Sequence, residues 1–382
     1  MEQKRTLSKW ISARKYIREF AANYAERYGE DPAEIERDIL TAKKQNHISL
    51  NEYEWVGYHD RTEAQKRTMS TLWTRAEFRK NFTDRRYIAI LMNKYIFSKV
   101  FADFYGRRCV QASDVDAALL ESLAGDCGKV VYKPNCKGQG TGVRVLGTAT
   151  EQARTETIAY LRANPGGIVE EYIQQHPTLA QLNPGAVSIV RFYTVTAPSG
   201  TYLFAPVLTT AIEKDISNGC QDALTAMIDI RTGVVLTDAV DQNNCIDYHA
   251  HPVTGVAFHG LQLPFWDETI DMMRRAVPLA SKISNIGWDV TMTADGPLII
   301  EANTIPGFNT AAMPGSRTAT VISRCSTSLM ASRLCRTATT RACCASSTES
   351  APRRYRHGTC SLDRFRRLDR HHRICLPSCD RL

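Results

Sequence analysis

The first 106 residues carry apolar positions at the spacing of amphipathic helices. In the N-terminal stretch these positions are Trp10, Ile11, Tyr16, Ile17, Phe20 and Tyr24. Such stripes are typical of a packed core rather than of a cofactor site. Asp31-Pro32 is a typical helix start and Gly106 a typical helix stop. Further helices are therefore predicted from Pro32 to before Asn46, from about Glu63 to Arg79, and from Ile88 to Tyr105.

After Gly106 short β-branched runs alternate with helical segments. Strands are predicted at Val130 to Tyr132 and at Ile168 to Val169, with a helix from Glu151 to Ala163 between them. An amphipathic helix is predicted from Trp266 to Lys282. This mixture predicts an α+β protein.

Residues 287 to 307, GWDVTMTADGPLIIEANTIPG, predict a β-hairpin with Asp295-Gly296-Pro297 as its turn. Glu301 and Asn303 lie two positions apart in the second strand and therefore share a face. A three-residue connection would pair Asp289 with Asn303, whereas a two-residue loop on Asp295-Gly296 would direct Asp289 to the opposite face. We expect an odd-length loop or a bulge near Asp295 that puts Asp289 on the shared face.

Asp289, Glu301 and Asn303 are the candidate metal ligands. Two carboxylates and an amide carbonyl are hard oxygen donors, which Mg²⁺ binds together with water and substrate phosphates. The pattern therefore predicts a metal–nucleotide site. The alternative is an amphipathic hairpin with solvated acids.

Residues 129 to 147, KVVYKPNCKGQGTGVRVLG, predict a phosphate-binding loop. A strand ends in Lys133 and runs into glycines at alternate positions, Gly138, Gly140 and Gly142. Glycines let backbone amides approach an anion, and Lys133 and the neighbouring Lys137 add positive charge. The spacing matches neither a Walker loop nor a dinucleotide fingerprint. A glycine-rich hairpin turn is the alternative.

The stretch IVEEYIQQHP suits adenine recognition. Glu170 and Glu171 follow a short predicted strand, and Ile173 comes two residues later. A carboxylate would accept the exocyclic amine, backbone groups would serve the ring edge, and Ile173 would pack on the ring face.

Net charge gives no support for a nucleic-acid partner. The formal charge of +8 comes from residues 311 to 382, which carry 14 Arg, no Lys and four acids, whereas residues 1 to 310 have a net charge of −2. The body of the chain is therefore not basic. The hydrophobic content of the whole chain, 43%, is ample for a buried core.

Cysteine usage predicts a reducing, cytoplasmic location. Seven of the 12 cysteines follow residue 311, and the other five lack paired spacing. The charged N-terminus lacks an apolar signal core, and no apolar run is long enough for a transmembrane segment.

In this order the elements resemble the ATP-grasp superfamily, most closely its sugar-transfer-associated branch. The resemblance covers roughly residues 85 to 312 and includes the long stretches QQHPTLAQLNPGAVSIVR and HPVTGVAFHGLQLPFWDE. Its ordered elements are the Asn93-Lys94 helix start, the Lys133 strand with its glycine loop, the IVEEYI hinge, Arg191 in VSIVRF, and GWDV followed by IIEANTIPG.

The resemblance implies two α+β lobes that clasp ATP within residues 85 to 316, with a lid at roughly 129 to 173. A helical N-terminal region, 1 to 84, would precede them, and an irregular tail, 317 to 382, would follow.

By position, Lys94 and Lys133 would contact the ATP phosphates, and the loop of residues 138 to 142 would close over them. Glu170 and the backbone of residues 171 to 173 would hold adenine. Asp289, Glu301 and Asn303 would bind Mg²⁺.

Arg191 would stabilise charge on the transferred phosphoryl group. Many superfamily members have an arginine two residues before the first metal aspartate, where this chain has Gly287, so the role passes to Arg191. A structural salt bridge at a strand end is the alternative. A clear ribose-binding acid after the hinge is also missing.

The tail from about residue 317 lacks sustained apolar periodicity and is rich in arginine, serine and threonine. We expect it to be disordered as a monomer. A shifted reading frame would produce such a change, and a basic tail or a small zinc module are the alternatives.

The implied activity is an ATP- and Mg²⁺-dependent ligase that activates a small-molecule carboxylate as an acyl phosphate for attack by an amine or other nucleophile. The resembling branch places such a substrate in cell-surface polysaccharide assembly and suggests sugar-transfer enzymes as partners. A kinase, or a catalytically inactive nucleotide-binding partner of glycosyltransferases, are the alternatives.

Overall fold

The computed structural model describes residues 2–67, 71–138, 140–197, 200–213, 223–241, 246–304, 306 and 374–375. The described residues form two compact units, one ending at Asn81 and one beginning at Phe82. Apart from a two-residue strand, β12 (Ile374–Cys375), the tail from residue 317 lies outside the described residues, and so does the prediction made for it.

The first unit is helical and contains α1 (Glu2–Tyr28), α2 (Pro32–Asn46), α3 (Leu50–Trp55), α4 (Glu63–Arg67) and α5 (Leu72–Phe82). Asp31 caps α2 by accepting hydrogen bonds from the backbone of Ala33 and Glu34. The unit has its own apolar core, in which Ile35, Ile39 and Tyr53 are fully buried.

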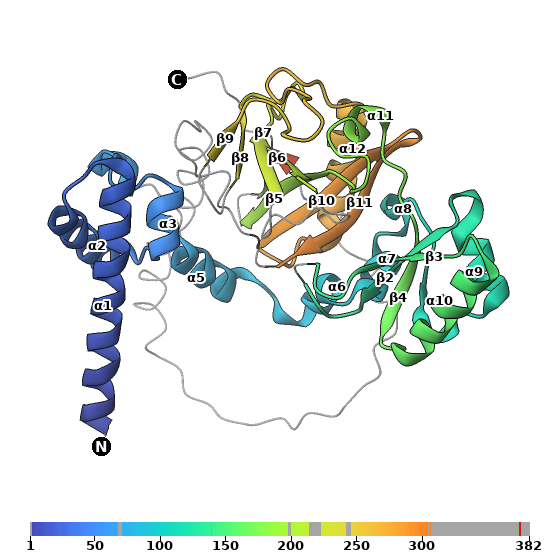
Figure 1. Cartoon of the computed structure of the whole chain (residues 1–382), viewed down its shortest axis with the longest axis horizontal. Coiled ribbons are helices and arrows are strands. Elements are labelled where there is room, and N and C mark those ends of the chain that lie inside the picture. Colours follow the sequence, from blue (N-terminus) through green and yellow to red (C-terminus); the bar gives the residue numbers. More distant parts are fainter. Residues whose placement is uncertain are drawn as a thin grey trace, which may run out of the picture. The chain divides into compact units, whose positions relative to one another are not determined.

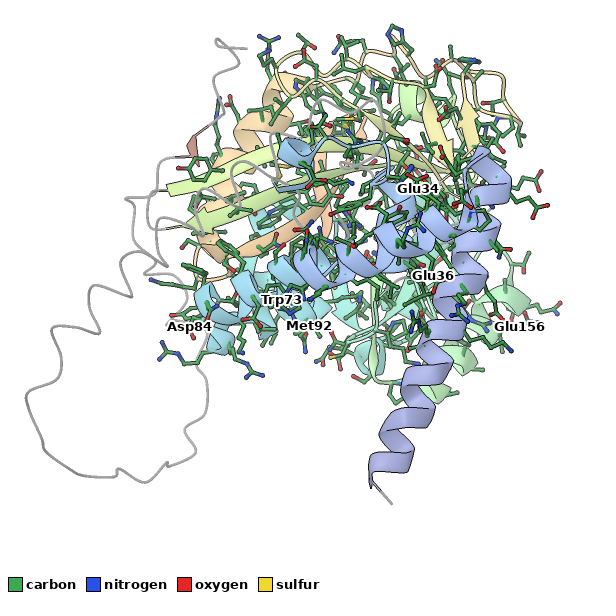
Figure 2. The ribbon with its side chains drawn as sticks, turned by 90° about the vertical axis from the view of Figure 1, so that its left-hand side faces the viewer. Glu34, Glu36, Trp73, Asp84, Met92 and Glu156 are labelled. Carbon is green, nitrogen blue, oxygen red and sulfur yellow. The ribbon has the colours of Figure 1, made fainter. Side chains whose placement is uncertain are left out.

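The predicted helix from Glu63 to Arg79 is wrong in its extent. Two helices stand there, because α4 ends at Arg67 and α5 begins at Leu72. Thr71 starts the second helix by accepting a hydrogen bond from Thr74 N to its hydroxyl at 3.3 Å. On α5, Trp73 (Figure 2) is 48% exposed. It stacks on the ring of His47.

The second unit opens with short helices rather than the single helix predicted from Ile88 to Tyr105. After η1 (Arg85–Tyr87) come α6 (Ala89–Met92), α7 (Lys94–Val100) and α8 (Ala102–Tyr105). Asn93 interrupts the expected helix because its backbone is extended and its side chain caps α7, accepting from Ile96 N at 3.0 Å. Gly106 ends α8 in the left-handed conformation, as predicted.

A four-stranded antiparallel sheet follows, in the order β1-β4-β2-β3. It consists of β1 (Cys109–Gln111), β2 (Lys129–Pro134), β3 (Arg144–Gly147) and β4 (Gly167–Glu171). Two helices, α9 (Ala117–Ala124) and α10 (Glu151–Ala163), lie against it (Figure 1), with η2 (Ala112–Asp114) and η3 (Gly125–Cys127) as connections. Leu120, Val130, Leu161 and Val169 are buried in the core between these helices and the sheet.

The larger sheet has the strand order β11-β10-β5-β6-β7-β8-β9, with β12 parallel to β6. Its other strands are β5 (Ile189–Ala197), β6 (Gly200–Ala211), β7 (Ala223–Met227), β8 (Ala239–Asp241), β9 (Ile246–Tyr248), β10 (Asn285–Thr293) and β11 (Gly296–Asn303). The short helix α11 (Pro177–Ala180) precedes β5.

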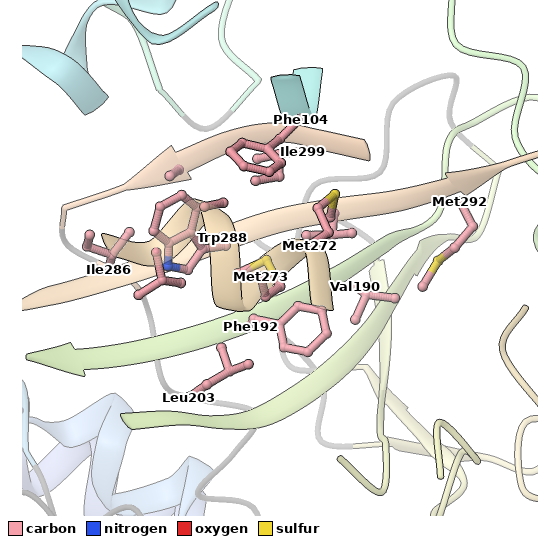
Figure 3. Close-up of a cluster of buried hydrophobic side chains, with 14 of the residues drawn as sticks. Phe104, Val190, Phe192, Leu203, Met272, Met273, Ile286, Trp288, Met292 and Ile299 are labelled. Carbon is pink, nitrogen blue, oxygen red and sulfur yellow. The ribbon is translucent and has the colours of Figure 1, made fainter. Parts of the chain in front are cut away.

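Helix α12 (Trp266–Ala276) and η4 (Val277–Ala280) cover the larger sheet. The helix expected from Trp266 to Lys282 is α-helical only to Ala276. It stops there because Pro278 has no amide hydrogen to continue the helical hydrogen bonds. Met272 and Met273 from α12 pack with Phe192 and Trp288 from the sheet (Figure 3). Trp288 is fully buried, and its indole donates to the Thr194 hydroxyl at 2.9 Å.

This core fixes β5 and β10, the two strands that carry Arg191 and Asp289. The family-level expectation of an α+β fold with two sheet-containing lobes and preceding helices is confirmed. Among the described residues, none of the helices combines the length and the apolar character that a membrane span requires.

Candidate functional site

The hairpin of β10 and β11 places Asp289 directly opposite Glu301. The pairing of Asp289 with Asn303 that a three-residue connection would produce is not found, since Asn303 lies opposite Gly287. The register shifts once, between Asp289 and Val290, because Val290 pairs with Ile299 and leaves Ile300 as an extra residue in β11. This bulge brings Asp289 to the face of Glu301.

The turn also differs from the prediction. Thr293 pairs with Gly296, so the connection has two residues, Ala294 and Asp295, and Pro297 lies within β11. The Thr293 hydroxyl accepts from Asp295 N at 3.2 Å and donates to Gly296 O at 3.0 Å. Thr293 thus closes the turn earlier than the Asp295-Gly296-Pro297 pattern suggested, and the bulge at Ile300 compensates for the even-length loop.

The three candidate metal ligands meet on one face of the hairpin. The Asn303 amide nitrogen lies 3.3 Å from Asp289 Oδ2 and 3.4 Å from Glu301 Oε1. Asp289 is 2% exposed. The sequence prediction that Asp289, Glu301 and Asn303 converge therefore agrees with the geometry. Of the two expected routes, an odd-length loop or a bulge near Asp295, the hairpin uses a bulge, which lies at Ile300.

Arg191 lies on the neighbouring strand β5, opposite Asp289. Its guanidinium donates to both Asp289 oxygens, through Nε to Oδ1 and through Nη2 to Oδ2, the latter at 2.9 Å. This is the bidentate arrangement that arginine favours with carboxylates. In this state Arg191 forms the structural salt bridge that was the alternative to its catalytic role.

The absence of a side chain at Gly287 makes room for Arg191. A Cβ at Gly287 would lie 3.3 Å from Arg191 Cδ and 2.6 Å from Pro306 Cβ. Any larger residue would therefore displace Pro306 or the arginine. The space beside Gly287 is therefore occupied in part by Arg191, the residue expected to take the role of the missing arginine.

The balance of charge at the hairpin favours a cation. Burial raises the pKa of Asp289 to about 6, and the nearby Glu301 carboxylate adds to the rise while Arg191 opposes it. The hairpin site therefore has two carboxylates, those of Asp289 and Glu301, and one guanidinium, that of Arg191. Within the described part of the chain, no group of three or more His, Cys, Asp and Glu side chains is placed to hold a metal ion. The amide oxygen of Asn303 would have to complete the ligand set, and this set suits Mg²⁺.

Glu170 lies in a second buried cluster. Its Oε1 accepts from the Tyr105 hydroxyl at 2.6 Å, and its Oε2 accepts from Arg107 Nε at 2.8 Å and from Lys133 Nζ at 2.9 Å. Burial alone would raise the pKa of Glu170, but Arg107 and Lys133 lower it to about 2. Here one carboxylate is surrounded by two cations.

This arrangement differs from the role expected for Glu170. Both carboxylate oxygens already accept hydrogen bonds from protein side chains, and the residue is 1% exposed. The neighbouring Glu171 carboxylate pairs with Arg108. An adenine contact through the Glu170 carboxylate therefore stays a prediction, as do contacts through the backbone of Glu171 and through Ile173.

Lys94 approaches the start of the glycine loop. Its ammonium donates to the Lys137 carbonyl, and its backbone amide donates to Asn135 O at 3.2 Å. Burial lowers the pKa of Lys94, and Lys133 lowers it further, whereas Glu301 and Glu170 oppose this effect. The Lys94 ammonium is therefore influenced by charges from both clusters, Lys133 and Glu170 in one and Glu301 in the other.

The glycine loop has the backbone freedom that was expected of it. Gly140 and Gly142 have φ of +67° and +77°, which few side-chain-bearing residues adopt. A Cβ at Gly142 would also lie 2.9 Å from Pro134 Cγ, whereas nothing lies within 4 Å of one at Gly138. Residue 139 lies outside the described residues.

Sequence reasoning missed Arg107 and Tyr105. Tyr105 ends α8 and Arg107 follows two residues later, both far from Glu170 along the chain. The pairing of β1 with β4, which puts Cys109 opposite Glu170, brings them to Glu170. An Arg-Arg pair after a helix is usually a solvated C-terminal charge. Only the observation that a buried acid at Glu170 needs a partner would have pointed to Arg107.

Comparison with known proteins identifies the fold. The family model described as sugar-transfer associated ATP-grasp matches residues 74–324. No curated protein matches the chain.

Solved structures with a similar fold include the ATP-grasp ligase PsnB complexed with minimal precursor, at 15% identity and a TM-score of 0.40, covering 65% of this chain and 63% of that chain. The D-alanine–D-alanine ligase from Bacillus anthracis complexed with ATP is 14% identical, with a TM-score of 0.38 and coverage of 65% and 66%. The chain thus spans about three-fifths of the length of PsnB.

Proposed function

The chain belongs to the sugar-transfer associated ATP-grasp family, and on this premise we propose that it is an ATP- and Mg²⁺-dependent ligase. It would activate a carboxylate as an acyl phosphate for attack by an amine or another nucleophile. The observation that carries the proposal is the opposite charge balance of the two clusters. The hairpin has two acids for one guanidinium, and the Glu170 cluster has two cations for one acid.

The cationic cluster and its neighbour Lys94 would receive the phosphates. Lys133 projects from the last part of β2, and Glu170 holds its ammonium at 2.9 Å. A lysine held in this way loses less conformational freedom when it binds an anion than a solvated lysine does. Gly138, Gly140 and Gly142 would let backbone amides approach the same phosphates.

The hairpin would hold the metal through Asp289, Glu301 and Asn303. Bound Mg²⁺ would neutralise the charge that develops on the transferred phosphoryl group. Asp289 stays bound to Arg191, which fixes the direction of its carboxylate. Glu301 accepts a long hydrogen bond from the Asn303 amide, at 3.4 Å, and is therefore the more available ligand.

In the proposed reaction, a substrate carboxylate oxygen attacks the γ-phosphorus of ATP, and the bond to the bridging oxygen breaks with its electron pair leaving on ADP. A nucleophile such as an amine then attacks the acyl carbon, loses a proton, and displaces inorganic phosphate. Arg191 would stabilise the charge on the phosphoryl or acyl phosphate oxygens. To do so its guanidinium must keep a donor free beyond the two that reach Asp289, and arginine has five N–H donors.

The biological process in which the substrate takes part is a second, more specific proposal. The family description links these proteins to sugar transfer. We therefore propose a role in cell-surface polysaccharide assembly with sugar-transfer enzymes as partners, and a cytoplasmic location for it. The N-terminal helices before residue 85 are a candidate platform for the substrate or partner.

Product analysis tests the activity. Purified protein is incubated with ATP, Mg²⁺ and panels of carboxylates and amines, and ADP, phosphate and new products are quantified. A ligase gives ADP and phosphate in equal amounts together with a new amide or ester. A stable phosphorylated product would indicate a kinase instead, and nucleotide binding without turnover would indicate an inactive binding partner.

A further inference from the structure

Arg107 is the most completely engaged charged side chain around the site. It lies between α8 and β1, and its side chain is 3% exposed. Its guanidinium donates to Glu170 Oε2 at 2.8 Å, to Tyr105 O at 2.9 Å, and to Ile299 O and Ile300 O at 3.1 Å each. It also stacks on the Tyr105 ring, 3.6 Å from the centroid.

These acceptors belong to two parts of the site that are distant in sequence. Glu170 is the penultimate residue of β4 in the smaller sheet and holds Lys133. Ile299 and Ile300 belong to β11 of the larger sheet, and Ile300 is the extra residue of the bulge. One guanidinium therefore joins the acid that orients Lys133 to the backbone directly before Glu301.

The contact to the bulge matters because an extra residue interrupts the regular hydrogen bonds between strands. Arg107 supplies donors to the carbonyls of Ile299 and Ile300, where the interruption lies. A buried carbonyl without a donor is costly, so these bonds favour the bulged register over a regular one. The bulged register is what puts Glu301 opposite Asp289.

We propose that Arg107 is a positioning residue that fixes Glu301 and Lys133 relative to each other, so that the metal side and the phosphate side of the site form together. This inference rests on the proposed function, because it assumes that Glu301 binds Mg²⁺ and Lys133 binds phosphate. Arg107 itself touches neither reactant in this account.

Lysine cannot replace arginine in this role. A lysine ammonium is a compact charge with three donors on a flexible stem, whereas the planar guanidinium reaches Glu170 and both carbonyls at once. Arg107→Lys retains the buried charge opposite Glu170 and is therefore the variant expected to fold. It should lose the contacts to β11.

The test measures nucleotide-dependent Mg²⁺ binding in the full chain by calorimetry, together with ADP release where a substrate pair is known. We expect Arg107→Lys to raise the half-saturating Mg²⁺ concentration by about tenfold, the usual size of an effect on a group that orients a metal ligand. Arg154→Lys, which changes a half-buried arginine on α10, should leave it unchanged.

A stability-matched control separates positioning from general loosening. Leu224→Ala removes a fully buried side chain from β7 and should lower the melting temperature without changing the Mg²⁺ requirement. An equal rise of the Mg²⁺ requirement in Leu224→Ala and Arg107→Lys would overturn the inference, because the effect would then follow from lost stability.

A second variant keeps the inference testable if Arg107→Lys does not fold. Tyr105→Phe removes only the hydroxyl that donates to Glu170 and keeps the ring beneath the guanidinium. Because Arg107 links Glu170 to β11, this change should weaken ATP binding and also raise the Mg²⁺ requirement about twofold or more. A change in ATP binding alone would overturn the link.

Measurements on the wild-type protein separate failure of the proposed function from failure of the positioning role of Arg107. If it binds no ATP with Mg²⁺, the proposed function fails and the role of Arg107 fails with it. If it binds both and Arg107→Lys binds Mg²⁺ as tightly as the wild type, only the positioning role is wrong.

Discussion

Two carboxylates in this molecule are buried to almost the same extent, yet they have opposite surroundings. Glu170 is 1% exposed and accepts hydrogen bonds from Arg107, Lys133 and Tyr105, and its pKa falls to about 2. Asp289 is 2% exposed and has one arginine and a second acid beside it, and its pKa rises to about 6.

The difference shows that burial alone does not reveal what a carboxylate does. A buried acid with surplus cations is already compensated and serves to hold those cations in place. A buried acid with a second acid beside it is under-compensated, and a metal cation would remove the repulsion. The first arrangement suits the anionic end of a metal–nucleotide complex and the second suits its metal.

The largest effect is expected from Glu301→Ala. This change removes the less engaged of the two hairpin acids and should lower Mg²⁺-dependent ADP release by about a thousandfold or more, since it deletes a charged metal ligand. The fold should stay intact because Glu301 lies in a polar cluster, so circular dichroism should be unchanged.

The matched control is Asp295→Ala, an exposed acid in the turn of the same hairpin. It should retain wild-type turnover. If Glu301→Ala retained wild-type turnover, the hairpin would not be the metal site.

Lys133 should matter more than Lys137. Lys133 is 9% exposed and held by Glu170, whereas the exposed Lys137 precedes the glycine loop. We expect Lys133→Ala to weaken ATP binding by about a hundredfold and Lys137→Ala by only a few-fold, as measured by calorimetry. The reverse order would mean that the phosphates lie elsewhere on the loop.

The free energy of unfolding should depend on the protonation of Glu170 at acid pH. The folded-state pKa of Glu170 is below its ordinary value of 4.5, so its contribution is present above about pH 4.5 and is lost as the pH falls towards 2. Glu170→Gln should lower the free energy of unfolding near neutral pH by about 3 kcal/mol, because two buried cations lose their partner. It should also flatten the stability profile below pH 4.5 in urea titrations.

Asp289 should give the opposite pH dependence. Its folded-state pKa is raised from 3.8 to about 6, so the stability linked to its protonated form is present below about pH 3.8 and is lost as the pH rises to 6. Protons should compete with Mg²⁺ below pH 6, and the half-saturating Mg²⁺ concentration should rise by up to about tenfold per pH unit there. A pH-independent Mg²⁺ requirement between pH 5 and 7 would contradict the assignment of Asp289.

Much of the site could be predicted from local sequence. Glu301 and Asn303 share a face because of strand periodicity alone, and Lys133 lies in the last part of β2, one residue before the strand ends at Pro134. The ATP-grasp family, predicted from the order of its motifs, is confirmed by the match over residues 74–324.

The remainder depends on contacts that sequence periodicity does not encode. The predicted turn was wrong because Thr293 closes a two-residue connection. A bulge was one of the two expected routes, but it lies at Ile300, where Arg107 contacts it from another part of the chain. Asn93 divides a helix that the apolar pattern read as continuous, because a side-chain cap competes with helix propagation.

The most direct test of opposite charge balance is a crystal structure of the protein with Mn²⁺ and a non-hydrolysable ATP analogue, in which anomalous scattering locates the metal. The account predicts a peak about 2.1 Å from carboxylate oxygens of Asp289 and Glu301, with the analogue's phosphates in hydrogen-bond distance of Lys133. A metal peak away from both hairpin acids, or phosphates that do not contact Lys133, would contradict it.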